Sequence, residues 1–203
     1  MKNLIKTTTV LIVFMCLAFI PKNEKFTVIV DAGHGGLDLG ATQNGISEKE
    51  IVASIAQKIQ VLNKNPNLEI LLTRNGDQNL SLQERIEFIN AMKPNLVISL
   101  HTNSTKNLNT NGLEVYISEK SLEYTASKDF ANQFSTSFSN KTPLDVKPIK
   151  NANFYILKKS EVPSILVELG YLSNEKDKNY IIAKENQIAI AQNILDFVLN
   201  LKL

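Results

Sequence analysis

The sequence is poor in the residues that most often stabilise small exported domains or bind metals. Its 203 residues include one cysteine, Cys16, and two histidines. Cys16 lies in the first twenty residues, which differ in composition from the rest and which we expect to lie outside the folded domain. That domain then has no cysteine for a disulfide, so its core must supply its stability. A metal site in it would have to use histidine and carboxylate ligands.

The sequence also lacks an excess of charge of either sign. Lysine and arginine together number 22 and aspartate and glutamate 20, and two of the lysines, Lys2 and Lys6, lie in the first twenty residues. The remainder of the chain is therefore neutral. Nucleic-acid-binding domains carry a basic patch or stripe, so we expect no nucleic acid among the partners.

No apolar run reaches the roughly 20 residues that a transmembrane helix needs. The run Val10–Ile20 is shorter; it follows two lysines and ends at Pro21. A basic segment followed by a short apolar one is typical of an export signal. We expect residues 1–20 to be a signal peptide or, since no clear A-x-A cleavage site is present, a retained N-terminal anchor. Residues 21–203 then form one exported domain in the cell envelope, held at the membrane only if that segment is retained.

Apolar runs alternate with stretches of helical periodicity along the rest of the chain. We expect strands at residues 26–31, 68–73, 96–100, 112–118, 154–157 and 164–169, and helices at residues 48–62, 81–92 and 121–139 and near the C-terminus. Continuous apolar strands that alternate with helices are typical of a parallel sheet covered on both sides. The sequence therefore predicts an α/β fold: a single domain with a mostly parallel twisted sheet of about six strands and helices on both faces.

Both histidines directly follow apolar strands. His34 comes after the first predicted strand and His101 ends the third, while Glu168 lies near the end of the last. Functional sites of parallel sheets gather at the carboxyl ends of the strands, so these three residues could share one edge. Either histidine alone would more simply be a hydrogen-bonded structural residue.

Two glutamates stand at apolar positions. Glu48 lies on the same face of its predicted helix as Ile51, Val52 and Ile55, where a carboxylate is costly unless it is paired or binds a cation. The alternative is a first-turn glutamate that only complements the helix dipole. Glu168 interrupts an otherwise buried strand; it is either a general acid or base in a dry site, or half of a structural ion pair with an arginine.

Two imidazoles, one carboxylate ligand and a free carboxylate are the groups that a catalytic zinc hydrolase uses. The candidate ligands are scattered along the chain, and no compact motif such as H-E-x-x-H is present. Their spacing alone therefore does not establish a zinc site.

At these positions the chain strongly resembles the zinc-dependent N-acetylmuramoyl-L-alanine amidases of the Amidase_3 type, from about Phe26 to the C-terminus. The resemblance is carried in order by VIVDAGHGGLDLGA at 28–41, GISEKE at 45–50, LLTR at 71–74, LSLQERIEFIN at 80–90, LVISLHTNS at 96–104 and ILVELGYLSN at 165–174. Ala32 departs from the proline usual at its position, and Ile89 and Thr102 replace small residues.

The resemblance implies that residues 21–203 are a zinc amidase catalytic domain. His34, Glu48 and His101 would bind Zn²⁺, and Glu168 would be the catalytic general base. Four further motif residues match without a role that we can assign, namely Arg74, Arg85, Asn90 and Asn103.

The implied substrate is peptidoglycan. The bond cut would join the lactyl group of N-acetylmuramic acid to L-alanine, attacked by a zinc-activated water. Two alternatives remain: a catalytically inactive peptidoglycan-binding module on the same fold, which the four retained site residues disfavour, and another zinc peptidase or deacetylase. The sequence leaves the oligomeric state open, and we expect a monomer.

The break in composition at Pro21 generates a first prediction. A protein that begins at Lys22 should be soluble, folded and active, because the residues before it contribute nothing to the predicted core. Circular dichroism and turnover of this shortened chain are the measurements. An insoluble or unfolded product would show that the N-terminal segment belongs to the domain.

Overall fold

A six-stranded sheet forms the centre of the computed structural model, which describes residues 25–201. The strand order is β4-β1-β5-β8-β6-β7. The strands are β1 (Phe26–Ala32), β4 (Leu68–Leu72), β5 (Leu96–Asn103), β6 (Glu114–Ile117), β7 (Lys150–Asn151) and β8 (Ser164–Tyr171). The first four in this order run parallel, β6 is antiparallel to β8, and β7 is parallel to β6. A short hairpin of β2 (Thr42–Gln43) and β3 (Ile46–Ser47) precedes the first helix.

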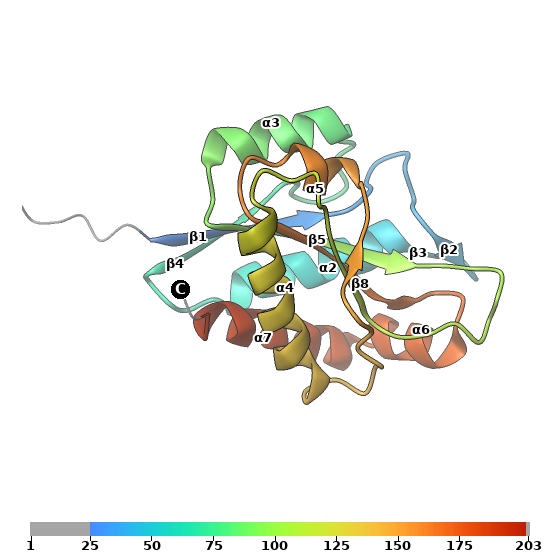
Figure 1. Ribbon diagram of the computed structural model, residues 1–203. Helices are drawn as coiled ribbons and strands as arrows, with labels where there is room; N and C mark the ends of the chain where they lie inside the picture. The colour runs from blue at the N-terminus through green and yellow to red at the C-terminus, as the bar shows by residue number, and fades with distance from the viewer. Residues whose placement is uncertain (1–24, 202–203) are drawn as a thin grey trace, which may run out of the picture.

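Helices cover both faces of this sheet (Figure 1). They are α2 (Glu48–Leu62), α3 (Leu82–Met92), α4 (Tyr124–Ser139), α5 (Tyr155–Lys159), α6 (Glu175–Ile182) and α7 (Lys184–Leu199). The large core packs α2, α4, α6 and α7 on one face, and a smaller core packs α3 and α5 on the other. Alternate residues of β1 divide between them, since Val28 and Val30 join the large core and Ile29 the small one. The predicted fold class is confirmed. Among residues 25–201, no helix is long and apolar enough to cross a membrane.

Helices α3 and α2 begin in different ways. Helix α3 begins with a capping box: the side chain of Ser81 accepts from the backbone N–H of Glu84, and the side chain of Glu84 accepts from the backbone N–H of Ser81. Ser47 is the N-cap residue of α2, but its side chain makes no cap hydrogen bond and donates instead to Glu50. The start of α2 is therefore held by tertiary contacts rather than by its cap.

One predicted strand is wrong. Residues 154–157 were expected to extend the sheet, but Tyr155–Lys159 forms the short helix α5. A short apolar run has no periodicity that separates a strand from a helix, and here Ile156 and Leu157 pack against Ile86 and Ile89 of α3 over the sheet. The sixth strand is instead β7, a pair of residues that precedes this run.

The sheet face under α3 and α5 changes character along the strands. Ile29, Val97 and Leu166 belong to the small core. Two residues further along each strand stand Asp31, Ser99 and Glu168, and these successors face the same way because side chains alternate in a strand. The register pairs Asp31 with Ser99, Glu168 with His101, and Glu168 with Glu114 of β6. A polar row therefore crosses the sheet at the carboxyl ends of its parallel strands.

Candidate metal centre and active site

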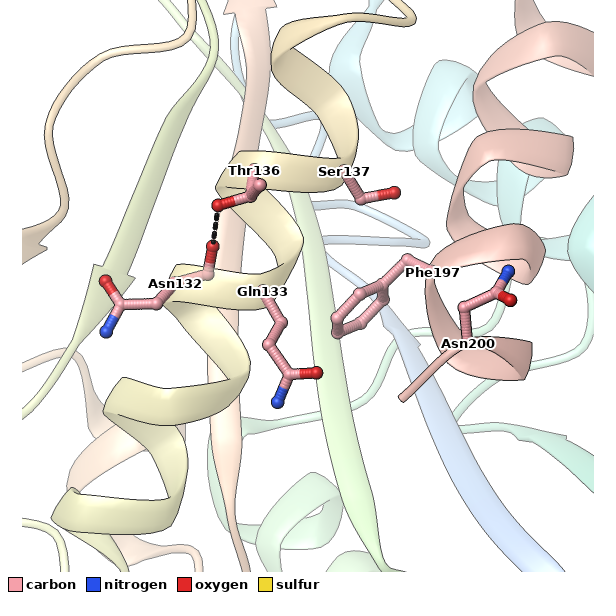
Figure 2. A pocket seen from close by; sticks show the side chains of 6 residues that line it. All are labelled: Asn132, Gln133, Thr136, Ser137, Phe197 and Asn200. Carbon is pink, nitrogen blue, oxygen red and sulfur yellow. Dashed lines mark hydrogen bonds between the residues drawn. The ribbon is translucent and has the colours of Figure 1, made fainter. Parts of the chain in front are cut away.

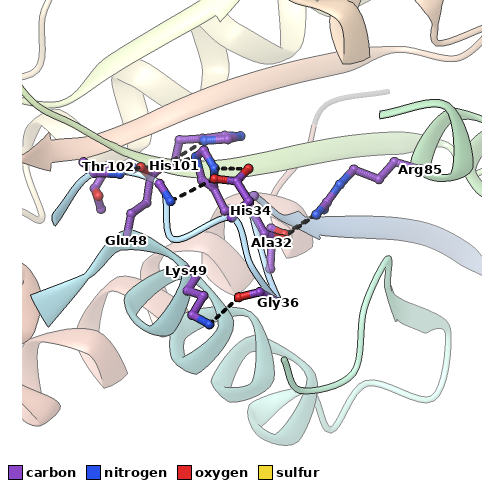
Figure 3. A network of polar contacts seen from close by, with 12 residues as sticks. Ala32, His34, Gly36, Glu48, Lys49, Arg85, His101 and Thr102 are labelled. Carbon is purple, nitrogen blue, oxygen red and sulfur yellow. Dashed lines mark hydrogen bonds and ion pairs between the residues drawn. The ribbon is translucent and has the colours of Figure 1, made fainter. Parts of the chain in front are cut away.

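Two histidines and one glutamate meet at this edge of the sheet. Nε2 of His34 lies 3.1 Å from Oε1 of Glu48, and Nδ1 of His101 lies 2.9 Å from the same oxygen. Figure 3 shows Glu48, at the first position of α2, beside both rings. His34 comes from the loop after β1 and His101 from β5. The fold therefore brings together three residues that lie far apart in the sequence.

Glu48 is 3% exposed, and both its oxygens are engaged. Oε1 also accepts from the backbone N–H of Thr102, and Oε2 accepts from that of Ala41. Burial raises the pKa of Glu48, but the hydrogen bonds from His101 and His34 outweigh it and hold the pKa well below its usual range. The hydrogen bond to Glu48 in turn raises the pKa of His34 to about 9. The buried carboxylate of Glu48 is thus an anion that positive charge nearby would stabilise.

The three side chains fit a metal ion. One ligand atom from each lies within 4.8 Å of the others. A tetrahedral Zn²⁺ with ligand bonds of about 2.0–2.1 Å would separate ligand atoms by roughly 3.3 Å, close to the spacings found here. Asp38 lies 2.8 Å from Nδ1 of His34, so the other ring nitrogen is directed toward the centre. Carboxylate partners of this kind commonly orient metal-binding histidines.

Glycines leave room for the rings of this centre. A Cβ added at Gly33 would lie 2.3 Å from Cε1 of His101, although the backbone of Gly33 lies outside the left-handed region. A Cβ at Gly40 would meet Glu48 and His34 at less than 3 Å, and this residue also has a φ of +64°. The absence of a side chain at both positions is therefore needed for the histidines to approach Glu48.

Two buried arginines fix the loop that carries His34. Arg74 donates to the backbone carbonyls of Ala32 and Gly33, and Arg85 to those of Ala32 and His34. His34 itself has a φ of +58°, a conformation that side-chain-bearing residues rarely adopt. The arginines therefore hold the loop in a shape that it would not adopt alone.

Arg85 is anchored in turn by Asp31, which lies 2.6 Å from its guanidinium. Asp31 also accepts from Ser99 and Thr73. Burial raises the pKa of Asp31, but Arg85 and the two hydroxyls outweigh it and keep the pKa below its usual value. The sequence matched Arg74 and Arg85 to motif positions without a role, because carbonyl partners from a distant loop leave no trace in the local pattern.

The two motif asparagines lie outside the His34–Glu48–His101 cluster. Asn90 donates to the carbonyl of Lys159 and accepts from the backbone N–H of Glu161, which ties α3 to the segment between α5 and β8. Asn103 accepts from the backbone N–H of Ser104 and lies 3.5 Å from Glu114.

Glu168 stands next to the centre but outside the cluster of ligand atoms. Its register partner on β5 is His101, and its Oε2 is buried without a hydrogen-bond partner among the described residues. Burial raises the pKa of Glu168 to about 7. The ion pair with an arginine that the sequence left open is wrong, because Arg74 and Arg85, the two arginines of the chain, bind other partners. A carboxylate of this kind can exchange a proton near neutral pH.

A cavity of about 300 Å³ opens beside the centre and reaches toward α3. Its lining includes Gly33, His34, Asn79, Leu82, His101 and Ile156. Another cavity of about 330 Å³ lies between α4 and α7 and is lined by Asn132, Gln133, Thr136, Ser137, Phe197 and Asn200 (Figure 2). Its lining has no histidine, cysteine or carboxylate, so acid–base or metal chemistry is available only in the first of these two cavities.

Fold and site together define an α/β protein with a candidate His–Glu–His metal centre at the carboxyl edge of its sheet. The sequence profile of the N-acetylmuramoyl-L-alanine amidase family, Amidase_3, matches residues 28–200. The chain belongs to this family.

Relatives in sequence and in structure agree with this assignment. The chain is 30% identical over 173 residues to the uncharacterized protein YqiI of Bacillus subtilis, covering 85% of this chain and 83% of YqiI. It is 32% identical to the B. subtilis amidase LytC over 84% of this chain, but spans only 34% of that longer protein.

Two solved structures share the fold over most of both chains. The catalytic domain of CwlV, an N-acetylmuramoyl-L-alanine amidase of Bacillus (Paenibacillus) polymyxa, superposes with a TM-score of 0.80 at 35% identity, covering 87% of this chain and 99% of that one. An N-acetylmuramoyl-L-alanine amidase of Clostridium difficile gives a TM-score of 0.81 at 29% identity, covering 87% and 96%.

The close approach of Gly33 to His101 generates a prediction. Gly33→Ala should displace the imidazole ring, lower the metal content and reduce turnover on the order of 10²-fold, as a misplacement near 1 Å can do. Metal content by atomic emission and turnover are measured side by side.

Gly45→Ala is the matched control. A Cβ there would meet nothing within 4 Å, although the φ of +78° strains the backbone. This variant should lose some thermal stability and keep its metal. Full metal content and full turnover in Gly33→Ala would show that the site tolerates the added methyl group.

Proposed function

We propose that this protein hydrolyses the amide bond between the lactyl group of N-acetylmuramic acid and L-alanine in peptidoglycan. His34, Glu48 and His101 bind Zn²⁺, and Glu168 is the general base. The observation that carries the proposal is the convergence of two histidines on the buried carboxylate of Glu48. Beside them, the buried Oε2 of Glu168 has no hydrogen-bond partner among residues 25–201. Membership of the amidase family supports the choice of substrate and bond.

A bound Zn²⁺ would polarise the scissile carbonyl and make the attacking water more acidic. The protein supplies the remaining functions. Asp38 and the backbone N–H of Thr102 orient two of the ligands, His34 and Glu48. The loop held by Arg74 and Arg85 keeps His34 at its place beside the cavity.

Glu168 accepts and then donates the proton that the reaction transfers. Its carboxylate accepts a proton from the attacking water as the oxygen bonds to the carbonyl carbon. It then passes this proton to the nitrogen of L-alanine while the C–N bond breaks, so that the peptide stem leaves as a free amine and the lactyl group as a carboxylic acid. The acid then releases its own proton to solvent and becomes a carboxylate. A carboxylate with a pKa raised toward neutral suits both transfers.

Three further expectations belong to this proposal. The protein acts in the cell envelope, where peptidoglycan lies, and residues 1–20, outside the described part of the chain, direct its export. The inactive binding module is disfavoured because it would not need a carboxylate with a buried, unpartnered oxygen next to intact candidate ligands. A different zinc peptidase or deacetylase has no observation in its favour.

The reaction is tested by mass spectrometry of purified peptidoglycan digested with zinc-loaded protein. We expect free peptide stems that begin with L-alanine, together with glycan chains that carry unsubstituted lactyl groups. Cleavage within the stem, release of acetate, or an undigested polymer would each contradict the proposal.

The roles of the two glutamates can be separated. Glu48→Ala should lose metal and turnover together, because two histidines alone hold zinc poorly. Glu168→Gln keeps the side-chain shape but cannot accept a proton, so it should retain about one zinc per chain and lose on the order of 10²–10⁴ in turnover. Zinc content by atomic emission is measured beside turnover for each variant.

Glu161→Gln is the control, since this glutamate is exposed and lies upstream of the same strand; it should match the wild type in both measurements. A near-normal rate in Glu168→Gln would make Glu168 structural. Loss of zinc from that variant would make Glu168 a ligand and put the assignment of Glu48 in question.

A further inference from the structure

Glu168 has a carboxylate neighbour that the proposed mechanism does not use. Glu114 of β6 is its direct register partner across the antiparallel pair of β6 and β8. Directly opposite residues point to the same face, with Cβ atoms about 4.5–5.5 Å apart. Glu114 is 3% exposed, and Oε2 of Glu168 is also buried, so two carboxylates with buried oxygens stand side by side.

The two carboxylates differ in their hydrogen bonds. Oε1 of Glu114 accepts from Nζ of Lys150 at 2.6 Å and from the hydroxyl of Tyr171 at 2.9 Å. Its Oε2 accepts from the hydroxyl of Tyr116 at 2.6 Å, with Nδ2 of Asn103 at 3.5 Å. A carboxylate offers about four acceptor positions, so these four donors occupy all the acceptor positions of Glu114.

Glu168 receives none of these donors, and its buried Oε2 has no partner within residues 25–201. This difference in hydrogen bonding is unexpected for neighbours on one sheet face, because buried polar atoms normally have a hydrogen-bond partner. Burial raises the pKa of Glu114, but Lys150 and the two tyrosine hydroxyls outweigh it and keep the pKa below its usual value. Glu114 therefore remains an anion that retains its donors.

We propose that Glu114 is a positioning residue that binds the surrounding donors and so keeps the carboxylate of Glu168 free to accept a proton from water. The proposal rests on the role of Glu168 in the proposed function. A base that already accepts hydrogen bonds from protein donors at every acceptor position cannot bond to the attacking water. The hydrogen bonds that Glu114 accepts therefore decide whether Glu168 can act as the base.

Lys150 is the donor that matters most. Its side chain extends from β7 past the ring of Tyr116, with Nζ 5.6 Å from the ring centre, and it is 43% exposed. The tyrosine hydroxyls are carried on rigid rings, whereas a lysine stem has four rotatable bonds. If Glu114 lost its charge, the ammonium group of Lys150 would be the donor able to turn to Glu168.

The test begins with Glu114→Gln, which keeps the shape and removes the charge. The variant should retain about one zinc per chain and a KM near that of the wild type, while kcat falls on the order of 10-fold or more, part of the 10²–10⁴ that a general base contributes. Its crystal structure should show Nζ of Lys150 within hydrogen-bond distance of Glu168. An unchanged kcat would overturn the proposal.

A second substitution at Lys150 separates this role from a general loss of structure. Glu114→Gln combined with Lys150→Met should recover most of the lost kcat, because no ammonium group is left to bind Glu168. Lys147→Met, which removes a surface lysine paired with Asp145, is the matched control and should leave kcat unchanged. A double variant as slow as Glu114→Gln alone would refute the role given to Lys150 and with it the proposal.

If Glu114→Gln does not fold, two double variants decide the question. Glu114→Gln with Lys150→Met and Glu114→Gln with Lys150→Gln are both free of an unpaired buried charge, and only the second offers a donor at position 150. The second should be slower, and equal rates would contradict the proposal.

The role of Glu114 can be disproved while the proposed function of Glu168 stands. In a Glu168→Gln background, Glu114→Gln should add less than about a twofold loss, since residues that act as one unit are not additive. A full further loss would show that Glu114 acts on another group. If Glu168→Gln alone has a normal rate, the proposed base is wrong and the proposal for Glu114 falls with it.

Discussion

One oxygen atom, Oε1 of Glu48, joins the parts of the structure on which the site depends. It lies within 3.1 Å of both imidazoles and accepts from the backbone of β5 at Thr102. Burying a carboxylate is costly unless charge and hydrogen bonds compensate it. Here the compensation comes from the loop after β1, from β5 and from the segment before α2. The buried charge therefore fixes how these three segments approach one another, and the geometry of the candidate metal centre is a consequence of that constraint.

The polar row on the sheet shows how one face can hold carboxylates in different states. Asp31 is paired with Arg85 and two hydroxyls, and Glu114 accepts from four donors. Glu168 of β8 has a buried oxygen to which no group of the described chain donates. The three residues share a face of the sheet. The most deeply buried of them, Asp31 at 1% exposed, keeps a pKa below its usual value, so burial alone does not distinguish them. The number of hydrogen-bond donors around each carboxylate distinguishes them, and of the three only Glu168 has its pKa raised, to about 7.

The loop that carries His34 illustrates why buried arginines are used here. Arg74 and Arg85 each spread their N–H groups over several backbone carbonyls, a fork geometry that a lysine cannot reproduce. Gly33 lets the ring of His101 pass against the loop, and Gly40 lets the chain turn beside Glu48. The arginine donors and the space left by the two glycines thus hold one strained residue, His34, in a single position.

The sequence by itself determined the α/β class, the strands and helices with clear periodicity, and the expectation that His34, His101 and Glu168 lie at one edge. These follow from local rules: strands of a parallel sheet end together, and a carboxylate on an apolar helix stripe, as at Glu48, needs a partner. The sequence did not distinguish a strand from a helix at 154–157, because a few apolar residues satisfy both patterns.

Only the tertiary structure decided which side chains meet. It placed both histidines on one oxygen of Glu48 and gave Arg74 and Arg85 their carbonyl partners. It surrounded Glu114 with donors, while within residues 25–201 no group donates to the buried Oε2 of Glu168. Glu114 had no distinguishing mark in an alternating strand. Its importance comes from register with β8 and from a lysine 36 residues away. Such contacts join segments distant in the chain, so no local pattern of residues encodes them.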